Sequence, residues 1–259
     1  MFELNHIRFA YGSKTVVDDI NLRFERGHFY GVIGPNGCGK STLIDLLAGH
    51  LNPNCGEIRL NETPLSTYSR KELSSQISIV PQDFRINFPY TCQEIVMMGR
   101  YPYIPKFAQP DRRDWAVVDR VIHETDLTGF ETRFVNQLSG GERQRVVFAR
   151  CLAQETPVLL LDEATSNLDM HHTLTLLNLA SRRVLENSLV ISVMQDINLA
   201  AMYCDRLVCM RDGKVFASGP VEEVLSARTL QSVFHVDVNV EKNDFSGNLQ
   251  VTFKKEMSH

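Results

Sequence analysis

Long hydrophobic runs are missing from this chain of 259 residues. A helix that crosses a bilayer needs roughly 20 consecutive apolar residues, and no run in the sequence approaches that length. The first six residues, Met1 to His6, also lack the basic-then-apolar pattern of a secretion signal. These absences predict that any membrane role of the chain comes through a partner.

Strong charge and paired cysteines are missing as well. The formal net charge is −4, which gives no electrostatic signature of a polyanion-binding surface, so we expect no nucleic-acid partner. None of the cysteines forms a C-x-x-C pair, and such scattered cysteines are typical of a reduced intracellular protein. They are Cys38, Cys55, Cys92, Cys151, Cys204 and Cys209.

A glycine-rich stretch with the pattern G-x-x-x-x-G-K-S is present, between an apolar run at 29–33 and a helix-like run at 42–48. Strand, glycine-rich turn and helix are the context of a phosphate-binding loop, and a chance glycine turn is the weaker alternative. The predicted ATP-binding residues of this loop are Gly34, Pro35, Asn36, Gly37, Cys38, Gly39, Lys40, Ser41 and Thr42.

The residue types in this loop fit phosphate chemistry. Glycines let backbone N–H groups converge on phosphate oxygens, and the following helix adds its positive end. Lys40 is predicted to reach the β- and γ-phosphates, and the Ser41 hydroxyl is predicted to ligate Mg²⁺. A nucleoside triphosphate with Mg²⁺ is therefore the expected ligand, and ATP is the nucleotide that the family resemblance described below implies.

Strands alternate with helices along the chain, which predicts an α/β fold with a parallel-sheet phosphate-loop core. Alternating apolar residues at 2–9, 20–25 and 57–60 indicate a small antiparallel β lobe. Residues 91–155 are predicted to form a helical subdomain within an ATPase domain spanning 1–235. A C-terminal β-hairpin extension is expected at 236–259. Periodicity does not give the strand order.

Asp162 and Glu163 follow the continuous apolar run 158–161, which is typical of a buried parallel strand. Open parallel sheets bind ligands at the carboxyl ends of their strands. Asp162 is therefore a candidate for the Mg²⁺ shell, and Glu163 is the candidate base for the attacking water. A surface turn is the alternative, although four apolar residues lead directly into the pair.

The stretch L-S-G-G-E at 138–142 has two interpretations. Alone, it is a helix N-terminus with Ser139 as the cap. Beside a phosphate loop, Ser139 and the amides of Gly140 and Gly141 form a second anion site. One nucleotide does not need two γ-phosphate sites in one chain, so we expect the second site to act on a partner's nucleotide in a head-to-tail homodimer.

The order of the motifs resembles the ATP-binding cassette ATPases over roughly residues 2–220. The motifs are the phosphate loop, P-Q-D, L-S-G-G-E, V-L-L-L-D-E and S-N-L-D. The resemblance implies that Tyr11 stacks on adenine and that Gln82 senses the γ-phosphate or metal and relays to a transmembrane partner. It implies that Ser139, Gly140, Gly141 and Asp169 act on ATP in trans. Metal contacts are implied for Ser41, Gln82 and Asp162.

Several of these residues have simpler interpretations. Tyr11 can be a lone surface aromatic, and Gln82 an ordinary loop residue. Asp169 can cap the helix that begins near residue 170, alone or in addition to its interface role. His171 and His172 lack a Cys or acidic residue at metal-binding spacing, so they are predicted to be exposed helix residues.

Residues 88–103 resemble the importer ATPases for iron chelates, haem and cobalamin in the stretches F-P-Y-T and M-M-G-R-Y-P-Y. Those proteins work with a membrane dimer and a periplasmic binding protein. The resemblance implies permease docking near Gln82–Pro105 and a place on the cytoplasmic face of the inner membrane. Clustered aromatics favour such a contact. They are Phe84, Phe88, Tyr90, Tyr101 and Tyr103.

Gln195 departs from the family pattern, which has a histidine before the aspartate at this point. We predict that Gln195 occupies this catalytic switch position and that the change affects hydrolysis more than ATP binding. The glutamine at this position leaves open an alternative in which the chain is a low-turnover ATP-binding switch. A soluble cassette acting in DNA repair or translation is the third hypothesis, disfavoured by a single cassette without a coiled-coil insertion.

Overall fold

The computed structural model describes residues 1–82, 84, 88–166 and 168–254. Asp83 of the P-Q-D motif, residues 85–87 of the predicted docking segment, Asn167 of S-N-L-D and the last five residues lie outside this description. The chain divides into two compact units. Unit 1 comprises Met1–Thr67 and Ile191–His259, and unit 2 comprises Tyr68–Val190.

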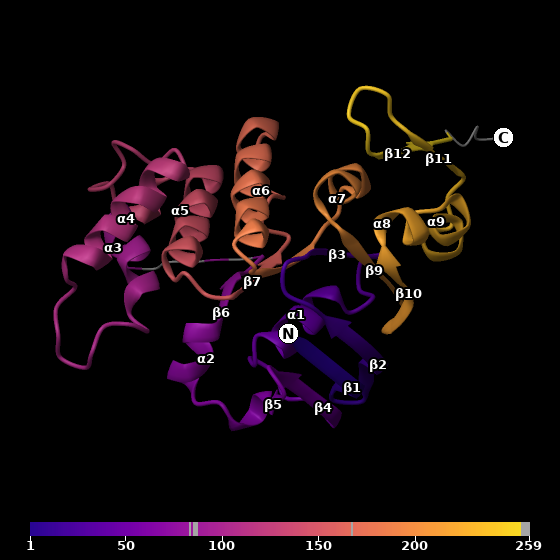
Figure 1. The fold of residues 1–259 in the computed structure, drawn as a ribbon, viewed down its shortest axis with the longest axis horizontal. Helices are drawn as coiled ribbons and strands as arrows, with labels where there is room; N and C mark the ends of the chain where they lie inside the picture. Colours follow the sequence, from indigo (N-terminus) through magenta and orange to yellow (C-terminus); the bar gives the residue numbers. More distant parts are fainter. Residues whose placement is uncertain (83, 85–87, 167, 255–259) are drawn as a thin grey trace. The chain divides into compact units, whose positions relative to one another are not determined.

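Unit 1 contains the predicted antiparallel β lobe, in the strand order β2-β1-β4-β5 (Figure 1). Alternation along β1 buries Phe2, Leu4 and Ile7, and Leu4 lies opposite Leu22 on β2. Apolar side chains on one face of these strands therefore form the core of the lobe. The strands are β1 (Phe2–Tyr11), β2 (Lys14–Phe24), β4 (Cys55–Leu60) and β5 (Thr63–Pro64).

Parallel strands carry the phosphate loop in the same unit. All residues of β3 (Phe29–Ile33) are buried, and β3 pairs in parallel with β9 (Arg206–Arg211). A tight Asp-Gly turn with positive φ at both residues joins β9 to β10 (Lys214–Pro220), as its sequence predicts. The order is β10-β9-β3, followed by β8 (Leu189–Val193), whose last residues belong to this unit.

The helices of unit 1 are short, and one differs from the sequence prediction. The sequence of residues 220–233 predicts one helix, but the structure breaks it at Leu225 and Ser226. The Ser226 hydroxyl caps the second piece by accepting a hydrogen bond from the Thr229 amide. The helices are α1 (Lys40–Leu47), η1 (Leu65–Thr67), α7 (Ile197–Tyr203), α8 (Val221–Val224) and α9 (Ala227–Phe234).

The predicted C-terminal hairpin is present as β11 (Val238–Lys242) and β12 (Leu249–Phe253). Asn198 of α7 holds the hairpin in place, because its side-chain amide pairs with the backbone of Val251 as a neighbouring strand would. Asn198 Oδ1 accepts a hydrogen bond from the Val251 amide at 2.7 Å, and Nδ2 donates to the Val251 carbonyl at 3.2 Å. The domain limits 1–235, 91–155 and 236–259 stay predictions.

Unit 2 holds the other strands of the parallel sheet. The first residues of β8 are followed by β7 (Val158–Asp162) and then β6 (Ile77–Val80). β6 and β7 are parallel, with Ile79 opposite Leu160. Every residue of β7 is buried, which confirms the interpretation of its continuous apolar run. The predicted combination of parallel core, antiparallel lobe and helical segment is thus confirmed.

The helices α3, α4 and α5 of unit 2 pack against one another (Figure 1). Helical spacing with Val118 and Ile122 predicts Trp115 on the apolar face of α4, but Trp115 is 41% exposed. The buried stripe contains Val117, Val118, Val121 and Ile122. Helix α2 had not been predicted, although its Ser69–Glu72 capping box was a readable signal. The helices are α2 (Arg70–Gln76), α3 (Cys92–Met97), η2 (Met98–Arg100), α4 (Arg112–Glu124), η3 (Val135–Gln137), α5 (Gly140–Ala153) and α6 (Met170–Leu185).

Within the described part of the chain, every helix is too short or too polar to span a bilayer.

Candidate nucleotide-binding site

The phosphate loop has a backbone that only glycine tolerates at two positions. Gly39 is the N-cap of α1 with a φ of 102°, and a Cβ there would lie 2.7 Å from the Val16 carbonyl oxygen. Gly34 also has a positive φ, and its Cβ would fall against the Met210 carbonyl. The loop therefore lies close against β2 and β9, and its shape depends on the absence of side chains.

Lys40 lies at the start of α1 and is only 6% exposed. Its ammonium donates hydrogen bonds to the carbonyl oxygens of Gly34 at 2.8 Å and Pro35 at 3.0 Å. These neutral acceptors hold the charge inside the loop, where a phosphate oxygen would be a stronger partner. The cation and the glycine backbone together fit a bound phosphate chain.

The remaining loop residues differ in exposure. Asn36 and Gly37 form an exposed tip, whereas Cys38 and Thr42 are buried and Ser41 is partly exposed. Burial raises the pKa of the Cys38 thiol, so this cysteine is neutral at physiological pH. Its backbone accepts a hydrogen bond from the Gly213 amide at 3.2 Å, which fixes the loop against the β9–β10 turn.

Tyr11 and Gln195 are the other predicted site residues of unit 1. Tyr11 ends β1, is 53% exposed, and packs edge-to-face on Phe9 with ring centroids 4.9 Å apart. An exposed ring is free to stack on a base, so adenine stacking stays a prediction. Gln195 follows β8 and is exposed. The preceding Met194 amide donates to the Val32 carbonyl at 3.1 Å, which places Gln195 beside the strand that leads into the phosphate loop.

Asp162 and Glu163 of unit 2 are 8% and 9% exposed at the end of β7. Glu163 has a φ of 50°, a left-handed conformation that non-glycine residues rarely adopt and that often marks functional sites. Gln82 Nε2 donates a hydrogen bond to Glu163 Oε2 at 2.9 Å. The structure thus joins the predicted sensor directly to the predicted base, a contact that the motifs did not reveal.

Gln144 is a residue of this region that the sequence interpretation missed. It lies in α5, is 7% exposed, and donates from Nε2 to the Ala164 carbonyl at 2.9 Å. Ala164 directly follows Glu163. The sequence signal was a glutamine two positions beyond L-S-G-G-E, and nothing local indicated its partner 20 positions away.

Ser139 caps α5 as predicted and closes a capping box with Glu142. The Glu142 amide donates to Ser139 Oγ at 3.3 Å, and the Ser139 amide donates to Glu142 Oε2 at 2.7 Å. Hydrogen bonds from the Ser139 side chain and backbone to the Glu142 carboxylate lower the pKa of that carboxyl. Ser139 and Gly140 are exposed, and a Cβ on Gly140 would meet open space. The helix N-terminus is therefore accessible from outside the chain.

Asp169 caps α6 and is exposed. Its carboxylate accepts hydrogen bonds from the His172 amide and from His172 Nδ1, each at 2.9 Å. The amide bond, followed by the ring, lowers the pKa of Asp169. His172 is partly buried against this carboxylate, so only His171 matches the prediction of an exposed residue. Among the described residues, no cluster of three His, Cys, Asp or Glu could hold a metal.

The predicted docking segment is aromatic at its surface. Phe88 is 66% exposed and Tyr101 is 57% exposed. Phe84 is only partly exposed and lies against the Arg150 guanidinium at 4.6 Å. Phe107 is 94% exposed just beyond the predicted limit of the segment at Pro105. The apolar surface therefore extends further along the chain than the sequence interpretation placed it.

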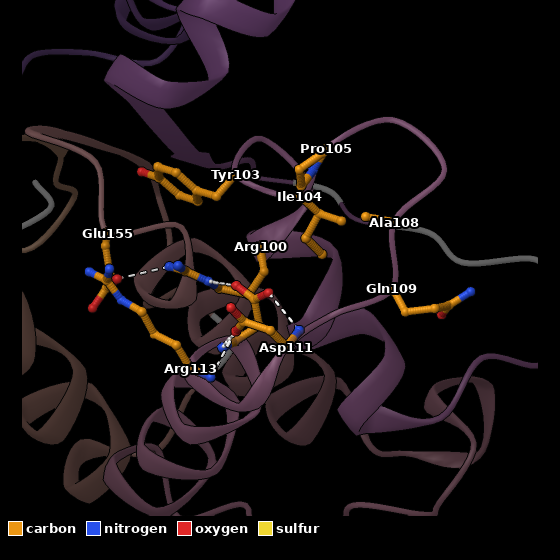
Figure 2. Close-up of a pocket in the computed structure, with 10 residues that line it drawn as sticks. Arg100, Tyr103, Ile104, Pro105, Ala108, Gln109, Asp111, Arg113 and Glu155 are labelled. Atoms are coloured by element: carbon orange, nitrogen blue, oxygen red, sulfur yellow. Dashed lines mark hydrogen bonds and ion pairs between the residues drawn. The ribbon is translucent and has the colours of Figure 1, made fainter.

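A cavity of about 550 Å³ lies under the loop that follows this segment, lined by residues of 100–114 and by Glu155 (Figure 2). Arg100 is 4% exposed at its centre. Its guanidinium pairs with Asp114 at 3.0 Å and with Glu155 at 2.8 Å, so the buried charge is neutralised on two sides.

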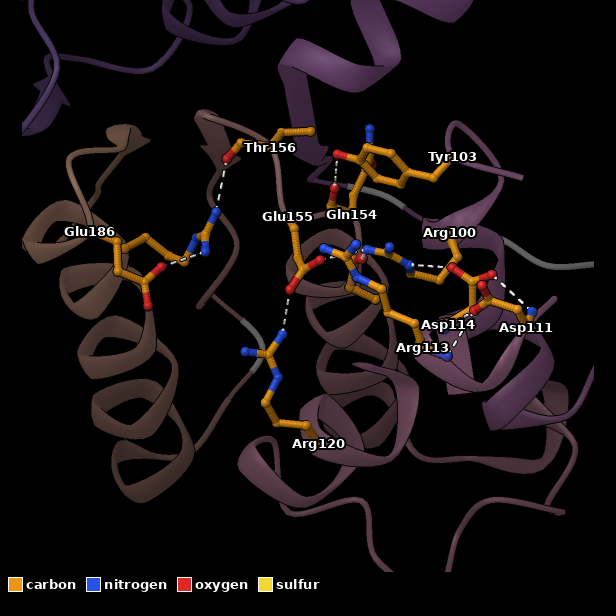
Figure 3. Close-up of polar contacts among 12 residues, drawn as sticks. Arg100, Tyr103, Asp111, Arg113, Asp114, Arg120, Gln154, Glu155, Thr156 and Glu186 are labelled. Carbon is orange, nitrogen blue, oxygen red and sulfur yellow. Dashed lines mark hydrogen bonds and ion pairs between the residues drawn. The ribbon is translucent and has the colours of Figure 1, made fainter. Parts of the chain in front are cut away.

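These contacts fasten the loop to the C-terminal end of α5 (Figure 3). Arg100 donates to the Ala153 carbonyl at 2.8 Å, and the Tyr103 hydroxyl donates to the Gln154 carbonyl at 2.6 Å. Arg120 binds the second oxygen of Glu155 at 2.8 Å. The predicted docking segment therefore contacts the C-terminal end of α5, whereas L-S-G-G-E forms its N-terminal end.

Parallel strands leading into a glycine-cradled lysine define a phosphate-loop nucleoside triphosphatase. Comparisons with known proteins refine this class. The ABC transporter family model matches residues 17–166, and the hemin import ATP-binding protein of Thermobifida fusca is 36% identical over 93% of this chain and 84% of that protein. The chain belongs to the ABC transporter family, which confirms the motif resemblance and implies ATP binding.

Other relatives and solved structures agree. A cobalamin import ATP-binding protein of Halobacterium salinarum is 39% identical over 92% of this chain and 59% of that protein. The petrobactin import ATP-binding protein of Bacillus anthracis is 35% identical over 95% of this chain and 90% of that protein. A chain of a metal-chelate type ABC transporter in an inward-facing conformation has a TM-score of 0.82 at 29% identity, covering 98% and 96%. A dimeric ATP-binding cassette with ADP and phosphate has a TM-score of 0.76 at 26% identity, covering 85% and 99%.

Proposed function

We propose that this chain is the ATP-hydrolysing subunit of a membrane importer for an iron chelate, haem or cobalamin. The observation that carries the proposal is Lys40, buried and held by carbonyl oxygens inside a glycine-shaped loop. The import ATP-binding names of the relatives support the transport class. The transported compound is not readable from this chain, because the ATPase subunit does not contact it.

The nucleotide is proposed to bind with its phosphates on the amides of 34–42 and on Lys40. Ser41, Gln82 and Asp162 are the proposed Mg²⁺ contacts, since a hydroxyl, an amide oxygen and a carboxylate suit this hard cation. Bound Mg²⁺ would neutralise phosphate charge. Glu163 is the proposed base that orients and polarises the attacking water, and Gln195 is the proposed donor to the γ-phosphate.

ATP is proposed to close a homodimer in which Ser139, Gly140, Gly141 and Asp169 of one chain act on the partner's nucleotide. The exposed α5 N-terminus supports this role, because its amides are accessible to an anion from another molecule. Size-exclusion chromatography with ATP and Mg²⁺, beside an ATPase assay, tests the function. A monomer without ATPase activity under all nucleotide conditions would contradict it.

The permease is proposed to dock on Gln82–Pro105, with a periplasmic binding protein acting indirectly through it. The chain would then lie on the cytoplasmic face of the inner membrane. The exposed rings of Phe88, Tyr90 and Tyr101 support this surface, since clustered apolar side chains mark contact sites.

Phe88→Asp is expected to reduce co-purification with the permease at least about tenfold, because it places a charge in an apolar contact. ATP affinity should be unchanged. Phe245→Asp is the matched control, since Phe245 is fully exposed on the C-terminal hairpin. Equal recovery of the permease with the two variants would show that it docks on another surface.

A low-turnover ATP-binding switch is the second candidate, and Gln195 favours it. A glutamine amide can donate to a phosphate oxygen but cannot carry positive charge. Losing one such donor entirely costs about 10²–10³ in rate. We therefore expect Gln195→His to raise kcat by less than that range, with ATP affinity constant, when both are measured on the assembled complex. An unchanged or lower kcat would remove the support for the switch.

A further inference from the structure

We infer that Gln144 is a positioning residue that links the L-S-G-G-E end of α5 to the catalytic base Glu163 of the same chain. The inference rests on the proposed function and deepens it. In the proposed dimer, the α5 N-terminus contacts the partner's nucleotide, whereas Glu163 acts on the chain's own nucleotide. Gln144 would therefore connect the two ATP sites.

The Gln144 hydrogen bond is well placed for this role. Its amide and the Ala164 carbonyl are both buried, so water does not compete for the 2.9 Å bond. Ala164 directly follows Glu163, whose left-handed backbone persists only where the surroundings hold it. The Ser166 amide holds the same turn by donating to the Glu163 carbonyl at 3.1 Å. A shift of Gln144 would thus act on the turn that directly follows the base.

The neighbours of Gln144 make the first turns of α5 rigid. Arg143 donates to the Leu138 carbonyl at 3.0 Å, and Arg145 donates to the carbonyl of Asp126, two residues beyond α4, at 2.6 Å. Three successive side chains thus attach this helix to the residue before Ser139, to the turn that follows Glu163 and to the segment after α4. Because the helix end is attached in this way, contact at Ser139 reaches Ala164 through Gln144.

Gln144→Met tests the link, since methionine keeps the length of the side chain and removes the donor. We expect kcat of the full-length protein with ATP and Mg²⁺ to fall about tenfold or more, because small displacements of a catalytic group are costly. The Hill coefficient for ATP should fall toward 1, while KM changes less than about twofold.

Gln154→Met is the matched control. Gln154 lies just beyond the other end of α5, and its amide also donates to backbone carbonyls, those of Ser74 and Ile77. This variant should keep the wild-type kcat and Hill coefficient, whatever its melting temperature. If both variants lose cooperativity equally, Gln144 contributes only stability and the inference is wrong.

Two further outcomes separate the inference from the proposed function. Gln144→Asn retracts the amide by one methylene, so it should reproduce the kcat loss even if the methionine variant does not fold; wild-type kinetics in it would overturn the link. A wild-type protein that neither dimerises with ATP nor hydrolyses it cooperatively would refute the composite site, and with it the link. If the wild type and Gln144→Met both hydrolyse ATP cooperatively, the link through Gln144 is refuted and the proposed function is not.

Discussion

Glu163→Gln is expected to lower ATP turnover by about 10²–10⁴-fold, the usual contribution of a general base, and to produce a long-lived ATP dimer. Glutamine keeps the shape of the side chain but removes the carboxylate that polarises water. The fold should be retained, because the new amide can turn its oxygen toward Gln82 Nε2 and preserve the 2.9 Å contact. Phosphate release and size-exclusion chromatography with ATP measure the two effects.

Glu222→Gln is a suitable control, since Glu222 is an exposed acid in α8. It should match the wild type in rate and oligomeric state. A Glu163→Gln protein with wild-type turnover would show that another group activates the water. One that stays monomeric at high protein and ATP concentrations would contradict the composite dimer site.

Lys40→Ala is expected to weaken ATP binding by about 100-fold or more. Hydrogen bonds to charged groups contribute roughly 1.5–3 kcal/mol each, and every 1.4 kcal/mol is about tenfold in affinity. The substitution also removes the donor that the Gly34 and Pro35 carbonyls share in this structure. Calorimetric titration with ATP and Mg²⁺ provides the measurement.

Lys14→Ala removes an exposed lysine of β2 and serves as the control. Its ATP affinity should equal that of the wild type, and its melting temperature should differ little. Wild-type affinity in Lys40→Ala would refute the assignment of this lysine to the phosphates. A parallel loss in both variants would instead indicate a general effect of reduced positive charge.

Local sequence patterns determined the fold class and the chemistry of the site. The unbroken apolar runs of β3 and β7 predicted buried strands, because a strand covered on both faces has no polar side. Ser139 signalled a helix start as an N-cap residue, and the structure adds a capping box with Glu142 there. The phosphate loop could be predicted because glycine, lysine and serine at this fixed spacing together suit the binding of phosphate and Mg²⁺.

Tertiary structure alone decided which of these residues touch. The Gln82–Glu163 bond joins positions 81 apart, and Arg100 reaches Glu155 across 55 positions. Local periodicity carries no record of such pairs, so neither the Gln144–Ala164 bond nor the strand order could be predicted. Trp115 shows the same limit, because its helical spacing matched the apolar stripe while its neighbours in space left it exposed. Contacts set by chain topology depend on the whole fold, whereas residue chemistry and local caps depend only on nearby sequence.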